Sequence, residues 1–248
     1  MGTFNALKKI FILAGIFFLA GASNPPSEDM SSDNIPNYRQ IFGDDYDKAI
    51  SFCRLHPEIS LFFMDNGISP DFAWAIVFPE LIRYGSVQDK LEMAALYTLY
   101  VNFGEPYANF SVGHFQMKPS FARQLETDYI RYKNLLPTIS DYSFDTTDTR
   151  QARTMRIYRL ENLKWQAKYL TLFIHLLQLK HPKYSSFGAA GKLVFFATAY
   201  NAGYGLTESQ LNALCQKKFF HTSLLNNSVE NKFNYAGIAL SYFENCSN

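Results

Sequence analysis

The chain has 248 residues, of which 48% are hydrophobic, 17% aromatic and 18% charged. This is enough apolar material for a sizeable core, and the length fits one domain or a domain with an extension. The formal net charge is only +1 at pH 7. Nucleic-acid binding requires a marked excess of basic residues, so we expect no nucleic acid among the partners of this chain.

The first 22 residues have the pattern of a secretory signal peptide. Lys8 and Lys9 precede the apolar run Ile10–Leu19, and small residues suited to a cleavage site follow at Ala20–Ala22. The run is shorter than the about 20 residues that span a membrane, although an uncleaved anchor is the alternative. Residues 1–22 contain two lysines and no acid, so their removal changes the net charge to −1. We predict export to the periplasm or cell envelope.

Three cysteines lie beyond this segment, at Cys53, Cys215 and Cys246. An oxidising compartment allows one disulfide and leaves one thiol over. Cys215 with Cys246 is the preferred pair because both lie in the last stretch, and three free thiols are the alternative. Neither a CxxC pattern nor a His-Cys spacing indicates a metal site, and we expect neither a metal nor a cofactor.

The rest of the chain has the pattern of a mainly α-helical domain. Residues 23–38 are polar and contain three prolines, so we expect a flexible N-terminal segment over 23–43 and one domain over 44–248. Ser69 and Pro70 suit a helix N-cap and first position, and Pro137 to Thr149 suits an exposed loop. One helix is expected to begin at Pro70. The other expected helices are Asp44–His56, 88–103, Gln151–Lys180, Ala189–Asn201 with Gly203 as its C-terminal cap, 207–217 and 231–244.

One of these helices contains a carboxylate on an apolar face. Asp71–Tyr84 is apolar nearly all round, as expected of a helix inside a core. Glu80 follows Ile76 by four residues, which places it on an inward face. Burial would raise the pKa of its carboxyl group, as a general acid needs near neutral pH. The alternative is that Pro79 ends the helix and leaves Glu80 in an exposed turn.

Two further segments could supply polar groups to a ligand. In Ser111–Pro119 (SVGHFQMKP), a glycine with neighbouring aromatic and amide residues suits a tight loop, and Gln116 could bond an acetamido or hydroxyl group. In Ala199–Gly205 (AYNAGYG), Tyr200 and Asn201 could face a cleft. A structural loop and a helix C-cap with its turn are the alternatives.

In this order, the segments resemble the soluble lytic transglycosylase family, which is related to goose-type lysozyme. The family's patterns are A-I-x-x-x-E, G-L-M-Q-x-M-P, N-I-x-x-G-x-x-Y-L and A-Y-N-A-G. They match, in turn, Ala75–Glu80, Gly113–Pro119 at its Gly, Gln and Pro, Asn162-Leu163 with Tyr169-Leu170, and Ala199–Gly203. The resemblance covers roughly residues 70–243, with a weaker echo at Asn234-Tyr235.

The resemblance implies a lysozyme-like helical domain that cleaves the β-1,4 bond between N-acetylmuramic acid and N-acetylglucosamine and leaves 1,6-anhydro ends. Glu80 would be the single acid/base, without a metal or cofactor. The implied partner is the peptidoglycan glycan strand, bound by a monomer that has at most a loose association with cell-envelope machinery. The implied substrate-binding residues are Gly113, Phe115, Gln116, Tyr200 and Asn201.

The sequence departs from the family at several positions. Leu81 stands where the family has Ser, Lys118 where it has an apolar residue, and Gln166 where it has Gly. Glu80 and Gln116 are 36 residues apart, about twice the usual separation, and this insertion brings Glu92 and Glu105 within reach as rival acids. Only Glu80 keeps the A-I-x-x-x-E context. A hydrolytic muramidase and a non-catalytic glycan-binding protein remain alternatives.

Overall fold

The computed structural model describes residues 36–84, 90–136, 142–221 and 232–246. Within these ranges the chain is mainly α-helical, as predicted, and β-structure is confined to two isolated bridges, Val112 with Met117 and Phe220 with Phe233. In chain order the helices are α1 (Tyr38–Phe42), α2 (Asp44–Leu55), α3 (Pro57–Asp65), α4 (Pro70–Tyr84), α5 (Lys90–Phe103), α6 (Pro119–Tyr132), η2 (Lys133–Leu135), α7 (Arg150–Glu161), α8 (Leu163–Lys180), η3 (Pro182–Ser186), α9 (Ala189–Ala202), α10 (Glu208–Leu214) and α11 (Tyr235–Cys246).

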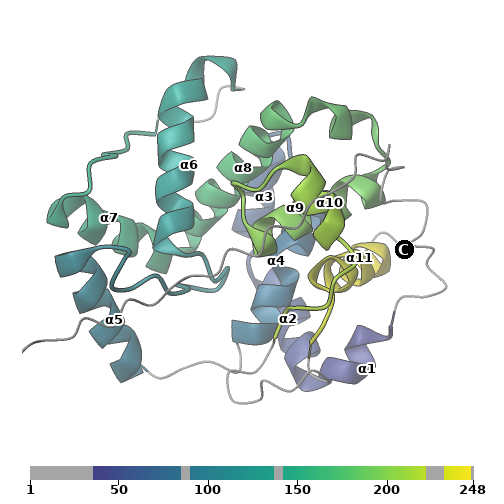
Figure 1. Cartoon of the computed structure of the whole chain (residues 1–248). Coiled ribbons are helices and arrows are strands. Elements are labelled where there is room, and N and C mark those ends of the chain that lie inside the picture. Colours follow the sequence, from purple (N-terminus) through teal and green to yellow (C-terminus); the bar gives the residue numbers. More distant parts are fainter. Residues whose placement is uncertain (1–35, 85–89, 137–141, 222–231, 247–248) are drawn as a thin grey trace, which may run out of the picture.

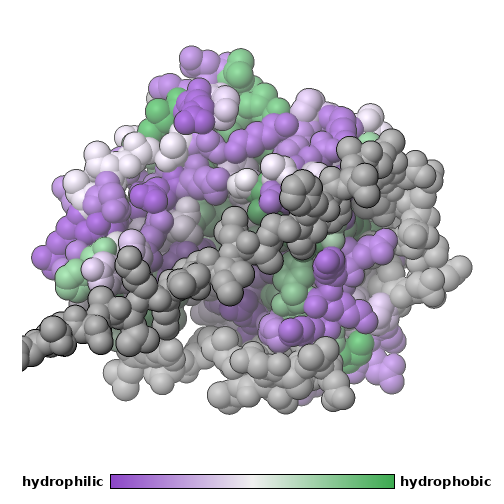
Figure 2. Space-filling model, in the orientation of Figure 1, coloured by the Kyte–Doolittle hydropathy of each residue, from purple (hydrophilic) through white to green (hydrophobic). Residues whose placement is uncertain are grey.

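Helix α4 is the centre of the fold. It packs against α11, α9, α2 and α3, and Figure 1 shows it in the middle of the molecule. Every residue from Phe72 to Ile82 is buried, which explains why this stretch is apolar on all sides. Hydrophilic residues predominate on the described part of the outer face in Figure 2. The buried apolar residues of the described chain form one core cluster that includes Phe72 to Phe78 of α4.

The proline in α4 does not end the helix. Pro70 occupies the first position, as predicted, and the carbonyl of Ser69 accepts a bond from the Ala73 amide at 3.0 Å. Pro79 lacks an amide hydrogen and so removes one helical hydrogen bond, yet the helix continues to Tyr84. Glu80 is therefore a buried helical residue, and the alternative of an exposed turn is wrong.

Ordered structure begins before Asp44, so the predicted flexible segment over 23–43 is wrong at its C-terminal end. The side chain of Asn37 caps α1 by accepting a bond from the Gln40 amide at 3.1 Å. Tyr38 is buried, and its ring stacks on Phe42 at 5.9 Å. Aromatic anchoring thus outweighs the polar, proline-containing composition of this stretch. Residues 1–35, with the predicted signal peptide, lie outside the described ranges.

The predicted long helix over Gln151–Lys180 is in fact two helices, α7 and α8. Asn162 separates them with φ −92° and ψ 120°, and its side-chain oxygen accepts a bond from the Trp165 amide at 3.2 Å. An Asn in this extended conformation is a good N-cap. The break allows α7 to pack on α5 and α6 as well as on α8. Helices α3 and α6 lie where no element was predicted, and both begin at a proline.

Two other expectations need correction. Tyr142 in the predicted exposed loop is buried against Tyr129, whose hydroxyl accepts a bond from the Tyr142 amide at 3.2 Å; residues 137–141 lie outside the described ranges. The preferred disulfide between Cys215 and Cys246 is absent, because all three cysteines are free thiols. Cys246 instead lines a cavity with Cys53.

The described part of the chain contains no helix that is both long and apolar enough to cross a membrane.

A buried ion pair ties together helices α5, α6, α7 and α8. Glu126 on α6 and Arg156 on α7 have side chains that are 0% and 1% exposed, and the guanidinium donates to Glu126 Oε2 from Nη2 at 2.7 Å. Arg156 Nη1 also donates to the Tyr100 hydroxyl of α5 at 2.7 Å. The Tyr169 hydroxyl of α8 donates to Glu126 Oε1 at 2.5 Å. Four helices thus meet at one satisfied network.

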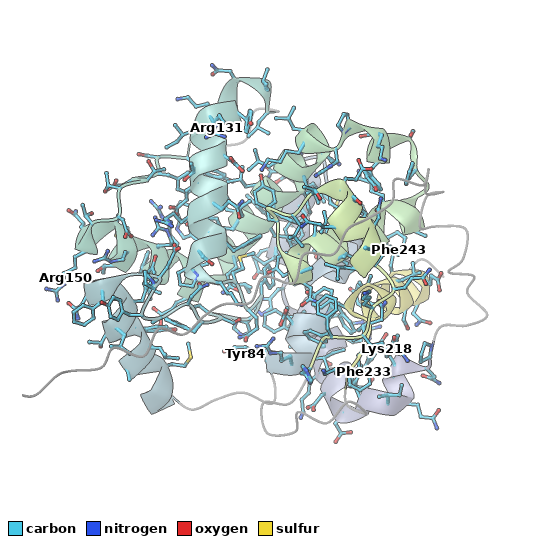
Figure 3. The ribbon with its side chains drawn as sticks, in the orientation of Figure 1. Tyr84, Arg131, Arg150, Lys218, Phe233 and Phe243 are labelled. Atoms are coloured by element: carbon cyan, nitrogen blue, oxygen red, sulfur yellow. The ribbon has the colours of Figure 1, made fainter. Side chains whose placement is uncertain are left out.

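Removing one partner of this pair should be strongly destabilising. Arg156→Met leaves the Glu126 carboxylate buried without its main counter-charge, and we expect a loss of roughly 3 to 5 kcal/mol in the free energy of unfolding. Urea denaturation measures this loss. Arg150→Met is the matched control, because Arg150 begins the same helix but is exposed at the edge of the molecule (Figure 3). A loss below about 1 kcal/mol for Arg156→Met would contradict the network's structural role.

Candidate active site

A cleft of about 370 Å³ opens where α4, α6 and α9 meet. Helix α4 contributes Glu80 and Arg83 from its last two turns. The loop before α6 contributes Gln116 and Lys118, and the end of α9 contributes Tyr200 and Asn201. The cleft therefore gathers polar groups from parts of the chain that are far apart in sequence.

Four of the six residues predicted for the site line this cleft: Glu80, Gln116, Tyr200 and Asn201. Gly113 and Phe115 do not line it. The ring of Phe115 is 0% exposed and packs edge-on against Trp74, with ring centroids 5.8 Å apart. The ring of Phe115 is therefore part of the core and does not face the cleft that the other predicted residues line.

Glu80 lies on the cleft as a largely desolvated carboxyl group. It is 5% exposed, and its Oε2 lies 3.6 Å from Arg83 Nη1, one helical turn further on. Oε2 accepts no hydrogen bond from any described residue. Burial raises the pKa of Glu80 from an ordinary 4.5 to about 7, while the charges of Arg83 and Lys118 act in the opposite direction. Near neutral pH this group exists in both protonation states, which suits general acid/base chemistry.

Two tyrosines close to Glu80 stay neutral. Burial raises the pKa of the Tyr200 and Tyr235 hydroxyls well above the usual 10, and the charge of Glu80 adds to the effect. Their ring centroids are 6.4 Å apart. The Tyr235 hydroxyl donates to the carbonyl of Ile76 at 2.9 Å, one turn before Glu80. Tyr235 was not predicted as a site residue, and its only signal in the sequence is the faint family echo.

The loop that faces Glu80 is fixed through the peptide groups of Phe115. The amide of Phe115 donates to Gln166 Oε1 at 2.7 Å, and its carbonyl accepts a bond from the Tyr200 hydroxyl at 2.6 Å. Gln166 on α8 is 0% exposed. From the sequence, Gln166 is recognised only as a residue that replaces the glycine of the third family motif. The structure shows that this long amide fills the space and holds the loop.

Gly113 permits this arrangement because no side chain fits at its position. Its φ is +71°, and a Cβ there would lie 2.1 Å from Gln166 Nε2 and 2.5 Å from the carbonyl of Leu160. Gln116 also has a positive φ of 50°, and its Nε2 donates to the Gly113 carbonyl at 2.8 Å. With its nitrogen engaged in the loop, the Gln116 amide has its oxygen left to accept a bond from a ligand.

The rival carboxylates do not compete for the role of Glu80. Glu105 Oε2 accepts a hydrogen bond from Arg123 Nη2 at 2.9 Å, and Glu105 Oε1 lies 2.8 Å from Arg123 Nε, so Glu105 is held as an ion pair. The side chain of Glu92 lies outside what the structure describes. Among the described residues that line the cleft, Glu80 is the only carboxylate. The part of the chain that the structure covers also holds no cluster of three or more His, Cys, Asp or Glu residues suited to a metal ion.

Comparison of the chain with protein-family models, with characterised proteins and with solved structures finds no match.

An alanine at position 113 should disturb the loop. Gly113→Ala adds a methyl group at a positive φ and forces Gln166 or the α7 backbone to move, so we expect a loss of about 3 kcal/mol in unfolding free energy. Chemical denaturation measures the loss. Gly188→Ala is the control, because a Cβ there meets nothing within 4 Å and φ is −56°. Equal stability of the two variants would show that the close approach at Gly113 is not a constraint.

The raised pKa of Glu80 predicts how the free energy of unfolding changes with pH. A folded-state pKa of about 7 against 4.5 means that ionisation opposes folding. The penalty is absent below pH 4.5, grows as pH rises, and reaches about 3 kcal/mol above pH 7. Glu80→Gln removes this penalty, so the stability of the variant relative to the parent should increase as the pH is raised from 4 to 8 in parallel urea titrations. A variant less stable than the parent at pH 8 would instead identify ionised Glu80 as a paired structural group.

Proposed function

We propose that this protein is a lytic transglycosylase with a lysozyme-like fold that cleaves peptidoglycan outside the cytoplasm. The bond cleaved is the β-1,4 link from N-acetylmuramic acid to N-acetylglucosamine, and the product ends in 1,6-anhydro-N-acetylmuramic acid. The observation that carries the proposal is the position of Glu80: one desolvated carboxyl group, with its pKa raised to about 7, on a polar cleft. Residues from three of the four motifs, Glu80, Gln116 and Tyr200 with Asn201, line this cleft and support the proposal.

The reaction needs a group that first donates and then accepts a proton. Protonated Glu80 donates to the glycosidic oxygen, and the bond from that oxygen to C1 of the muramic acid breaks. The carbonyl of the sugar's own N-acetyl group stabilises the positive charge that develops at C1. Ionised Glu80 then takes the proton from the C6 hydroxyl as its oxygen attacks C1. Glu80 ends protonated as it began, and a pKa near the working pH serves both steps.

The remaining cleft residues position the sugar. The Nδ2 atom of Asn201 is buried and has no hydrogen-bond partner among the described residues, so it can donate to a hydroxyl or acetamido oxygen. The Gln116 oxygen can accept a bond from a sugar hydroxyl. Tyr200 acts mainly through the loop, because its hydroxyl is bonded to the carbonyl of Phe115.

The chemistry separates this activity from two alternatives. Hydrolytic glycosidases usually employ two carboxyl groups, and the described lining of this cleft supplies one. A hydrolase of the same fold would instead activate a water with Glu80 and leave a reducing end. A non-catalytic glycan-binding protein would not use the raised pKa of Glu80. A monomer with at most loose contacts to cell-envelope machinery meets the needs of the proposed reaction.

The products and one substitution test the proposal. Purified mature protein incubated with peptidoglycan should release muropeptides lighter by one water than the hydrolytic products, as seen by mass spectrometry. Glu80→Gln should lower the rate by roughly 10³-fold because it removes the acid, while glycan binding persists. Glu105→Gln is the control carboxylate and should keep its turnover. Reducing-end products would favour the hydrolase, and full activity of Glu80→Gln would end the mechanism.

A further inference from the structure

The cleft is electropositive apart from Glu80. Its described lining holds two cations, Arg83 and Lys118, and one carboxylate. Arg83 lies 3.6 Å from Glu80 and so has a counter-charge within the cleft. Lys118 is exposed and forms no ion pair with any described residue. A fixed positive charge at the mouth of a sugar-sized cleft is a feature that a neutral polysaccharide would leave unused.

Lys118 lines the same cleft as Glu80. It immediately precedes α6, at the end of the loop that contains Gln116. Its charge lowers the pKa of Glu80, so the ammonium group is within electrostatic reach of the acid that would touch the glycosidic oxygen. Because Glu80 and Lys118 line the same cleft, a sugar bound at Glu80 brings its substituents into the space that Lys118 also borders. The neighbouring residues Gln116 and Ser120 are uncharged.

We propose that Lys118 binds the carboxylate of the lactyl ether on muramic acid, so that the preferred substrate is glycan whose lactyl carboxylates are free. This inference rests on the proposed function and specifies its substrate class. The lactyl group is attached to the same sugar whose C1 is attacked, which places its carboxylate beside the acid. The ligand chemistry is a carboxylate paired with an ammonium group at the rim of the cleft.

The chemistry of peptidoglycan decides when that carboxylate exists. In strands that carry stem peptides, the lactyl carboxyl is an amide and has no charge, and the carboxylates lie further out along the peptide. Only after the peptide is removed does the lactyl group carry its own negative charge. The reaction that supplies this substrate is therefore hydrolysis of the amide bond between the lactyl group and the first amino acid of the peptide.

Binding to three glycans tests the inference in the Glu80→Gln background, where turnover is removed. The ligands are peptide-free glycan fragments, the same fragments with their lactyl carboxylates converted to methylamides, and fragments that retain stem peptides. Calorimetry should give about fivefold tighter binding of the free carboxylate than of the methylamide, the size expected for one partly exposed ion pair. The preference should weaken as salt is raised.

A pair of lysines at the two ends of α6 provides the matched variants. Lys118→Met should abolish the preference, and the fold should survive because the Lys118 side chain makes no capping bond. Lys133→Met removes the same charge just past the other end, about 22 Å away along the helix, two residues beyond the labelled Arg131 in Figure 3. This control should keep the preference. Circular dichroism should show the same helical content in both variants.

Each outcome has a distinct meaning. Equal binding of carboxylate and methylamide fragments, or a preference that survives Lys118→Met, overturns the inference and leaves the proposed function intact. Tightest binding of the peptide-bearing fragments also overturns it, because the carboxylate recognised would then belong to the stem peptide. If the wild-type chain cleaves no glycan but the preference appears and depends on Lys118, the proposed function fails and the binding inference stands.

Discussion

The cleft depends on the backbone of one residue, Phe115, which is held on both sides. Its amide is bonded to Gln166 on α8 and its carbonyl to Tyr200 on α9, at 2.7 and 2.6 Å. The first bond is buried and the second is part-buried, so breaking the first leaves a buried polar group unsatisfied, at a cost of about 1–3 kcal/mol. The loop that carries Gln116 is thereby fixed relative to both helices. The positive φ values at Gly113 and Gln116 are maintained by these contacts.

The second constraint is the burial of Glu80, which the fold enforces by surrounding α4. Phe78 shows how tightly this is done: its ring lies 4.9 Å from Tyr46 of α2 and 4.2 Å from Tyr242 of α11. A helix enclosed in this way cannot turn Glu80 out to solvent without exposing its apolar neighbours. The energy that keeps the acid desolvated therefore comes from hydrophobic packing along the whole of α4. As a result, the cleft at the end of α4 contains a carboxyl group, Glu80, that can gain or lose a proton near neutral pH.

The sequence predicts what depends on local pattern and misses what depends on long-range partners. The apolar stretch around Glu80 favours a buried helical carboxylate, because burial on all sides leaves a continuous apolar pattern, but it leaves open the alternative that Pro79 ends the helix. Asn162 was overlooked as a helix boundary because the apolar residues keep their helical spacing from α7 into α8. Arg156 was not recognised as a core residue, because the sequence does not reveal that Glu126 lies opposite it. Gln166 looked like a mismatch for the same reason, since its partner is 51 residues away.

The charges of the cleft link substrate binding to the protonation of the acid. Desolvation raises the pKa of Glu80, and Arg83 and Lys118 partly offset this rise. A carboxylate bound at Lys118 would cancel much of the ammonium field felt by Glu80 and would add a negative charge nearby. Both effects raise the pKa of Glu80 further. An anionic glycan would thus favour the protonated form with which the proposed reaction starts, whereas a neutral glycan would leave the acid partly ionised. The charge of Lys118 would thus have two roles: it would bind the glycan carboxylate, and once neutralised by it, it would allow Glu80 to stay protonated.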